Sequence, residues 1–232
     1  MAKLYFRYGA MNSGKSTGLL QAAFNYEERG QRVLLAKPQV DSKGEAQIVS
    51  RLGVARPVDF LIPPGAELME LFRQEARGDD PTALLTQVDA GLAPVACLLV
   101  DEAQFLEPAQ VDDLLRIAVL ENVPVMAYGI RTDFRTASFP GSARLMELAH
   151  SLEELKTICR CGRKAIFNTR KVVDIGHDAG PVADAGPGTQ VPAHPRERFV
   201  FEGDQVAIDG VEVTYESLCG VCYLQESGGR LG

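Results

Sequence analysis

The sequence predicts an α/β fold, with a mainly parallel sheet in residues 1–152 and a smaller second domain in residues 153–232. Over the first 150 residues, short apolar runs alternate with amphipathic stretches, which is typical of a sheet covered by helices on both faces. A glycine-rich octapeptide joins the first apolar run to the first helical stretch. From residue 153 the composition changes to cysteines and basic residues, followed by a run rich in Gly, Ala and Pro.

Five strands are expected in the first domain, each short, apolar and bounded by Gly, Pro or charged residues. They are residues 3–8, 33–37, 58–62, 95–100 and 123–128. Helices are expected between them, at residues 17–29, 67–74, 81–89, 108–120 and 140–150. Gly30 ends the first helix, and Pro108 suits a first helical turn because its fixed φ matches the helix and its missing N–H is not needed there.

Length and charge bound the class of protein. A chain of 232 residues with 46% hydrophobic residues can form one large domain or a main domain with an appendage. The net charge of −7 argues against a surface that binds nucleic acid or an anionic membrane as a whole. The N-terminus runs directly into the first expected strand and no apolar run is long enough to span a membrane, so we expect a cytoplasmic protein.

The octapeptide fits the pattern G-x-x-x-x-G-K-[ST] and predicts a phosphate-binding loop. It consists of Gly9, Ala10, Met11, Asn12, Ser13, Gly14, Lys15 and Ser16. The two glycines let backbone N–H groups turn toward phosphate oxygens, Lys15 can reach the β- and γ-phosphates, and the Ser16 hydroxyl can bind Mg²⁺. The alternative is a glycine-rich turn that binds no ligand.

A second motif, ACLLVDEAQF at residues 96–105, places two acidic residues at the end of an apolar strand. In a phosphate-loop fold this strand lies beside the loop, so Asp101 can hold Mg²⁺ directly or through water. Glu102 is placed to accept a proton from the group that attacks the γ-phosphate, either a substrate hydroxyl or a water molecule. The alternative is an acidic pair that only caps a helix.

Cysteine spacing predicts a structural zinc site. Cys159 and Cys161 form one close pair, and Cys219 and Cys222 form another. Each pair can present two thiolates from one turn, which together would complete a closed Cys₄ shell at the base of the intervening loop. Four unrelated reduced cysteines are the alternative. Cys97 lies inside an expected strand and is interpreted as a small buried hydrophobic residue.

The strings GAMNSGKS, VDEAQF, YGIRTDF, ELKTICRCGRKA and TYESLCGVCY together resemble the thymidine kinases of bacteria and of animal cytosol. The resemblance covers residues 3–223. It implies transfer of a phosphoryl group from ATP to thymidine, a RecA-like core, and a zinc-bound small domain whose lasso loop covers the nucleoside. It also implies a homotetramer with dTTP as a feedback inhibitor.

The resemblance assigns site residues as well. It makes Glu102 the catalytic base and adds Asp101 and Gln104 to the ATP contacts of the phosphate loop. It implies that the nucleoside pocket is formed by Phe105, Phe134 and Phe139, by Val206 and Ile208 in the lasso at residues 205–210, and by Tyr215. An aromatic side chain beside a strand end can equally be part of the core.

Some positions depart from the family pattern. Ser50 stands where some members carry an acidic residue, which places a second carboxylate contribution to Mg²⁺ in doubt, and residues 178–196 are longer than a compact lasso needs. His150, His177 and His194 match nothing catalytic and are interpreted as structural or solvated.

Two other classes of protein remain open from the residues alone. One is a RecA-like ATPase that acts with nucleic acid, although the acidic chain offers no basic track. The other is a nucleotide-binding scaffold whose zinc module contacts a partner.

Overall fold

The computed structural model describes residues 1–40, 46–78, 93–174, 196–203 and 213–231. The chain forms two compact units, which are considered separately. The first comprises residues 1–132 and 138–157, and the second comprises residues 133–137 and 158–232. Residues 133–137 therefore belong to the second unit, although they lie between two segments of the first in sequence. The change in composition at residue 153 gave no sign of this earlier segment.

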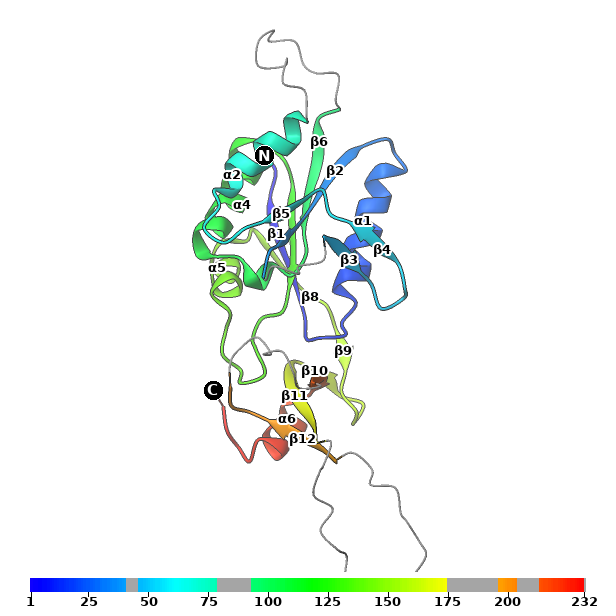
Figure 1. The fold of residues 1–232 in the computed structure, drawn as a ribbon, viewed down its shortest axis with the longest axis vertical. Coiled ribbons are helices and arrows are strands. Elements are labelled where there is room, and N and C mark those ends of the chain that lie inside the picture. The colour runs from blue at the N-terminus through cyan, green and yellow to red at the C-terminus, as the bar shows by residue number, and fades with distance from the viewer. Residues whose placement is uncertain (41–45, 79–92, 175–195, 204–212, 232) are drawn as a thin grey trace, which may run out of the picture. The chain divides into compact units, whose positions relative to one another are not determined.

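The first unit is built on a six-stranded sheet with the strand order β5-β2-β6-β7-β1-β8 (Figure 1). All neighbouring strands are parallel, which confirms the predicted α/β class. The strands are β1 (Leu4–Tyr8), β2 (Arg32–Pro38), β5 (Phe60–Ile62), β6 (Val95–Val100), β7 (Val125–Gly129) and β8 (Ser151–Glu154).

Two parts of this unit were not expected from the sequence. Strand β8 reads SLEE and lies at the edge of the sheet, where its polar residues give no apolar signal. The second is a short antiparallel hairpin of β3 (Gln47–Val49) and β4 (Ala55–Pro57), which precedes β5.

Buried side chains cover both faces of the sheet. Within β2, Val33 and Leu35 belong to one hydrophobic cluster, whereas Leu34 and Ala36 belong to the other. Alternate residues of a strand point to opposite faces, so this division means that both faces are covered. Near-continuous apolar strands such as β6, which reads VACLLV, follow from that double burial.

Helices cover the two faces unequally. Helix α1 (Lys15–Glu27) packs on one face through Leu19 and Ala23. On the other face lie α2 (Leu68–Arg77), α4 (Pro108–Leu120) and α5 (Pro140–Leu148) (Figure 1). Helix α4 begins with Pro108 after a capping box formed by Glu107 and Gln110. The helix expected at residues 81–89 lies outside the described residues. Among the helices that are described, none is long and apolar enough to cross a membrane.

The second unit has its own small core. Its three-stranded antiparallel sheet has the order β12-β11-β13, with β11 (Phe167–Asp174) in the middle, between β12 (Arg196–Val200) and β13 (Val213–Leu218). A short ribbon of β9 (Thr157–Ile158) and β10 (Lys164–Ala165) precedes it, and helix α6 (Gly220–Glu226) closes the chain. Tyr223 of α6 is buried and packs on Phe167, with 4.9 Å between the ring centroids.

Candidate active site

The predicted phosphate-binding loop connects β1 to α1. Gly14 adopts a left-handed conformation with φ of 79°, directly before the helix begins at Lys15. At Gly9 the limit is space, because a Cβ there would lie 2.5 Å from the Leu155 carbonyl oxygen and 2.5 Å from the Ser13 hydroxyl oxygen. The glycines of the motif therefore serve both loop conformation and close packing.

Lys15 folds back over this loop. Its side chain is buried, and its Nζ donates hydrogen bonds to the carbonyl oxygens of Ala10 at 3.0 Å and Gly9 at 3.4 Å. Burial lowers the pKa of Lys15, and the negative charges of Glu102 and Asp101 partly oppose that shift. Ser13 adds a buried hydroxyl that has no hydrogen-bond partner among the described residues. A buried ammonium group and an unpaired hydroxyl are suitable donors for phosphate oxygens.

Asp101 lies at the carboxyl end of β6, close to the start of α1. Its Oδ2 accepts a hydrogen bond from the Ser16 hydroxyl at 3.1 Å, and only 4% of the residue is exposed. Burial, together with the negative charge of Glu102, raises the pKa of Asp101 to about 6. A buried carboxylate beside a hydroxyl is an oxygen donor set of the kind that Mg²⁺ prefers.

Glu102 follows immediately, in a left-handed backbone conformation with φ of 49° and ψ of 36°. Its side chain is half-buried, and its Oε2 accepts a hydrogen bond from Nε2 of Gln104. Gln104 belongs to the 3₁₀ turn η1 (Ala103–Phe105), which begins directly after Glu102. The structure therefore brings the two acidic residues and Lys15 together, as the motifs indicated.

The predicted nucleoside-pocket residues do not all lie in one unit. In the first unit, the half-buried Phe105 and the buried Phe139 meet edge to face, with 5.5 Å between their ring centroids. Phe134 and Tyr215 belong to the second unit. Val206 and Ile208, and the whole lasso stretch at residues 205–210, lie outside the described residues, since only residues 196–203 and 213–231 of that region are described.

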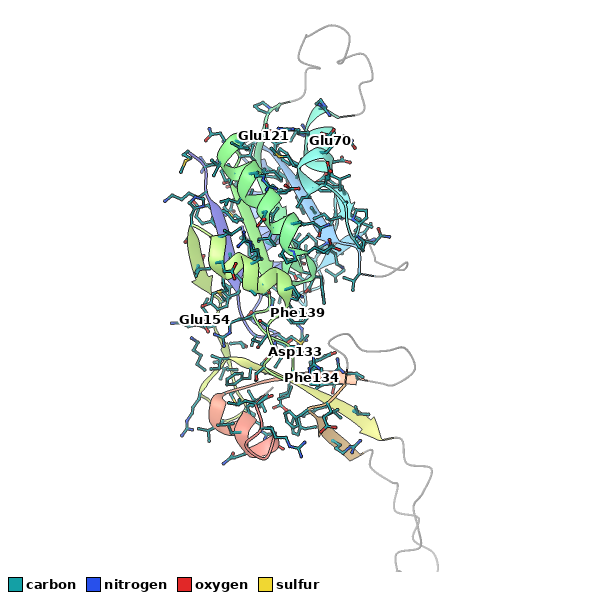
Figure 2. The ribbon with its side chains drawn as sticks, turned by 90° about the vertical axis from the view of Figure 1, so that its left-hand side faces the viewer. Glu70, Glu121, Asp133, Phe134, Phe139 and Glu154 are labelled. Atoms are coloured by element: carbon teal, nitrogen blue, oxygen red, sulfur yellow. The ribbon has the colours of Figure 1, made fainter. Side chains whose placement is uncertain are left out.

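Phe134 is held in the second unit by several contacts. Only 2% of it is exposed, and the Arg170 guanidinium lies over its ring, 3.9 Å from the centroid. Its carbonyl oxygen accepts a hydrogen bond from the Tyr223 hydroxyl at 2.9 Å. Figure 2 shows Phe134 next to Asp133, whose carboxylate accepts hydrogen bonds from the backbone N–H groups of Arg135 and Ala137. Sequence reasoning did not find this anchor, because it depends on contacts between distant parts of the chain.

The four paired cysteines come together in the second unit. The sulfur atoms of Cys159, Cys161, Cys219 and Cys222 all lie within 4.8 Å of one another. One pair comes from the turn before β10 and the other from the start of α6. The Cys222 backbone N–H lowers the pKa of Cys219 to about 6, whereas the neighbouring Cys161 side chain raises the pKa of Cys222 to about 12. Such a cluster is compatible with a zinc site.

Ser50, His150 and Cys97, which the sequence also singled out, make contacts within the fold. Ser50 is buried, and its hydroxyl accepts a hydrogen bond from the Val54 N–H at 3.2 Å within the β3–β4 hairpin. Nδ1 of His150 accepts a hydrogen bond from the Leu4 N–H at 3.1 Å. His177 and His194 lie outside the described residues. Cys97 is fully buried in β6, and burial raises the pKa of its thiol to about 12.

Comparison with known proteins places this geometry in a family. The family model described as thymidine kinase matches residues 2–59 and 69–223. A thymidine kinase of Ruegeria pomeroyi is 41% identical over 229 residues, which cover 98% of this chain and 96% of the relative. Thymidine kinases of Chromobacterium violaceum and of Legionella pneumophila strain Paris are 42% and 39% identical, covering 96% and 99% of this chain and 98% and 93% of the relatives. The chain therefore belongs to the thymidine kinase family.

Proposed function

We propose that this protein is a nucleoside kinase that transfers the γ-phosphoryl group of ATP to the 5′-hydroxyl of thymidine, giving dTMP for nucleotide salvage. The observation that carries the proposal is that Lys15 and Ser16 of the predicted phosphate loop lie close to Asp101 and Glu102, in a chain of this family. The relatives that match nearly the full length are thymidine kinases, which does not favour the alternative of a RecA-like ATPase acting with nucleic acid.

The phosphates of ATP would lie in the loop formed by residues 9–16. Backbone N–H groups at the start of α1 and the Lys15 ammonium group would neutralise phosphate charge. Phosphoryl transfer needs mostly positioning and charge neutralisation, so a loop held in place by close packing at Gly9 suits the reaction.

Mg²⁺ would be held by the Ser16 hydroxyl and the Asp101 carboxylate. When bound, it neutralises charge on the β- and γ-phosphates. The hydrogen bond between these two side chains supports the assignment, because it keeps both oxygens close enough to share one cation. Burial and the negative charge of Glu102 raise the pKa of Asp101, and a cation bound at this carboxylate would offset both effects.

Glu102 would act as the general base that accepts the proton of the thymidine 5′-hydroxyl. It is half-buried one residue after the Mg²⁺ ligand, so its carboxylate can remain accessible to a bound substrate. Phe105 would provide a flat wall for the thymine ring, with the buried Phe139 packed against it. The family resemblance also assigns Phe134, Tyr215, Val206 and Ile208 to nucleoside binding.

Zinc would be bound by the four clustered cysteines as a structural ion. A closed shell of four sulfurs leaves no position for a substrate, so zinc would stabilise the second unit and the lasso between β12 and β13.

We also propose a cytoplasmic location, where reducing conditions keep these thiols available for a metal. Assembly as a homotetramer and feedback inhibition by dTTP belong to the same proposal, and the net charge of −7 supports a function without nucleic acid.

The proposal is tested by measuring ADP formation from ATP with thymidine, with single-stranded DNA, and with neither. We expect rapid ADP formation only with thymidine, in equal amounts with dTMP. Stimulation by DNA would support the ATPase alternative. ATP binding without turnover in any of the three reactions would indicate a scaffold.

A further inference from the structure

Gln104 is a buried polar residue at the end of β6, and both ends of its side chain are occupied. Only 2% of the residue is exposed. Its Oε1 accepts a hydrogen bond from the Ile130 N–H at 3.2 Å, and its Nε2 donates to Oε2 of Glu102. Each of these partners lies within the first unit.

The backbone contact determines which way the amide group faces. The Ile130 N–H can only donate, so it requires the oxygen end of the Gln104 amide. The nitrogen end must then face Glu102. Because that nitrogen carries only donors, it pairs with an accepting oxygen of the Glu102 side chain. The amide is therefore oriented to hold the Glu102 carboxylate in one place.

Close packing keeps Gln104 in this place. A Cβ at Gly129 would lie 2.8 Å from the Gln104 Oε1 and 3.1 Å from its backbone nitrogen. A Cβ at Gly141 would lie 2.9 Å from the Gln104 carbonyl oxygen. Neither glycine has a positive φ, so what these positions require is space. The turn η1 is thus seated against two glycines that come from β7 and α5.

The backbone of Glu102 also needs such support. Residues other than glycine rarely adopt its left-handed conformation, which persists only where surrounding contacts hold it. The Gln104 side chain holds the carboxylate end of the same residue, from a position two residues further along the chain.

We propose that Gln104 is a positioning residue that fixes and orients the Glu102 carboxylate for proton transfer. This inference rests on the proposed role of Glu102 as the base. It gives Gln104 a function that differs from the ATP contact implied by family resemblance, since both amide ends bond residues of this chain and only 2% of the residue is exposed.

A double-mutant cycle tests the proposal, using Gln104→Met, Glu102→Gln and the two combined. The measured quantities are the single-turnover rate of dTMP formation and the KM for ATP. We expect Gln104→Met to lower the rate about 10- to 100-fold, as for the loss of a hydrogen bond to a charged group, with little change in the KM for ATP. In the Glu102→Gln background, the same change should alter the rate by less than about twofold, because its effect passes through Glu102.

A matched control is available in Gln110, another buried glutamine. Its Nε2 donates to the Pro63 carbonyl oxygen at 2.8 Å, and its Oε1 accepts from the Glu107 N–H, outside the candidate active site. Gln110→Met should lower the free energy of unfolding as Gln104→Met does, yet leave the rate of dTMP formation near normal. Should Gln104→Met not fold, Gln104→Asn serves instead, since its shorter amide cannot reach both partners.

The possible outcomes separate this inference from the proposed function. Equal losses from the Gln104 change in both backgrounds would overturn the positioning role alone. A raised KM for ATP with an unchanged rate would also overturn it, in favour of an ATP contact. A near-normal rate in Glu102→Gln itself would overturn the base assignment and the inference together.

Discussion

The Ser16 hydroxyl donates a hydrogen bond to Asp101 at 3.1 Å, and this contact joins the first turn of α1 to the carboxyl end of β6. These residues are far apart in the sequence and meet because the strands before them belong to one parallel sheet, in which the loops at the carboxyl ends share an edge. The contact brings a hydroxyl and a carboxylate to one point beside the phosphate loop. Its chemistry leads to the first two predictions.

Asp101→Asn should lower kcat/KM for ATP by about 100- to 1,000-fold, because the amide keeps the shape but loses the charge proposed to hold Mg²⁺. Steady-state kinetics over a range of Mg²⁺ concentrations provide the measurement. Raised Mg²⁺ should recover part of the loss. Asp112→Asn is the control, since Asp112 pairs with Arg144 on α5 and lies outside the candidate site. Near-normal activity of Asp101→Asn at low Mg²⁺ would contradict the assignment.

The same substitution should stabilise the ligand-free protein at neutral pH. The pKa of Asp101 is about 6 in the folded chain, above its ordinary value of 3.8, so the folded state keeps a proton that the unfolded state has lost. The free energy of unfolding therefore falls as the pH rises from about 4 to 6, and the stability that the protonated Asp101 provides at low pH is absent at pH 7.5. Asp101→Asn removes the effect and should raise the free energy of unfolding at pH 7.5 by up to about 3 kcal/mol.

Urea unfolding at pH 4.5 and pH 7.5 measures this difference. The gain from Asp101→Asn should be much smaller at pH 4.5, where the carboxyl is largely protonated in the folded chain. Asp112→Asn should show no gain at either pH, because it removes an ion pair with Arg144. A variant that is less stable than the original protein at pH 7.5 would show that the Ser16 contact outweighs the cost of the buried charge.

The cysteine cluster should bind about one zinc ion per chain. Cys159→Ser should lose the metal and lower the melting temperature, because three remaining thiolates cannot close the shell of a structural site. Metal analysis of the purified protein and thermal unfolding are the measurements. Cys97→Ala is the matched control, since it removes a buried thiol outside the cluster and should leave the metal content unchanged. Fully active protein without metal would contradict a structural role for zinc.

Local sequence signals predicted the parts of the site that depend on neighbouring residues. The phosphate loop needs two glycines, a lysine and a serine in fixed order after a strand, so its place between β1 and α1 could be read directly from residues 9–16. The five expected strands of the first unit are also present. They could be predicted because a strand that is buried on both faces of a sheet has a nearly continuous run of apolar residues. Strand β8 was missed because an edge strand can be polar.

Contacts between distant segments could not be predicted in this way. The pairing of Gln104 with Ile130 depends on the turn η1 and on the absence of a side chain at Gly129. The contact of Phe134 with Arg170 depends on residues 133–137, which interrupt the first unit in sequence and belong to the second. A glutamine after an acidic pair and an aromatic residue after a strand were visible, but their partners are fixed only by tertiary packing.

Of the two candidate aromatic residues in the first unit, Phe105 is better placed than Phe139 to contact a nucleoside. It is half-buried, whereas Phe139, which meets it edge to face, is only 4% exposed. A ring that keeps part of its surface accessible can stack on a base, while the buried ring supports it from behind. Phe105→Ala should therefore raise the KM for thymidine about 10-fold or more, as for the loss of an aromatic stacking partner, and change the KM for ATP little.

Two comparisons sharpen this last prediction. Phe24→Ala on α1 is the matched control, because that ring is 58% exposed and belongs to neither hydrophobic cluster of the first unit, so both KM values should stay unchanged. Phe105→Tyr should retain most of the affinity for thymidine, since the ring face is kept. If Phe105→Ala instead lowers the melting temperature and leaves the KM for thymidine unchanged, the ring serves the core and the base is held elsewhere.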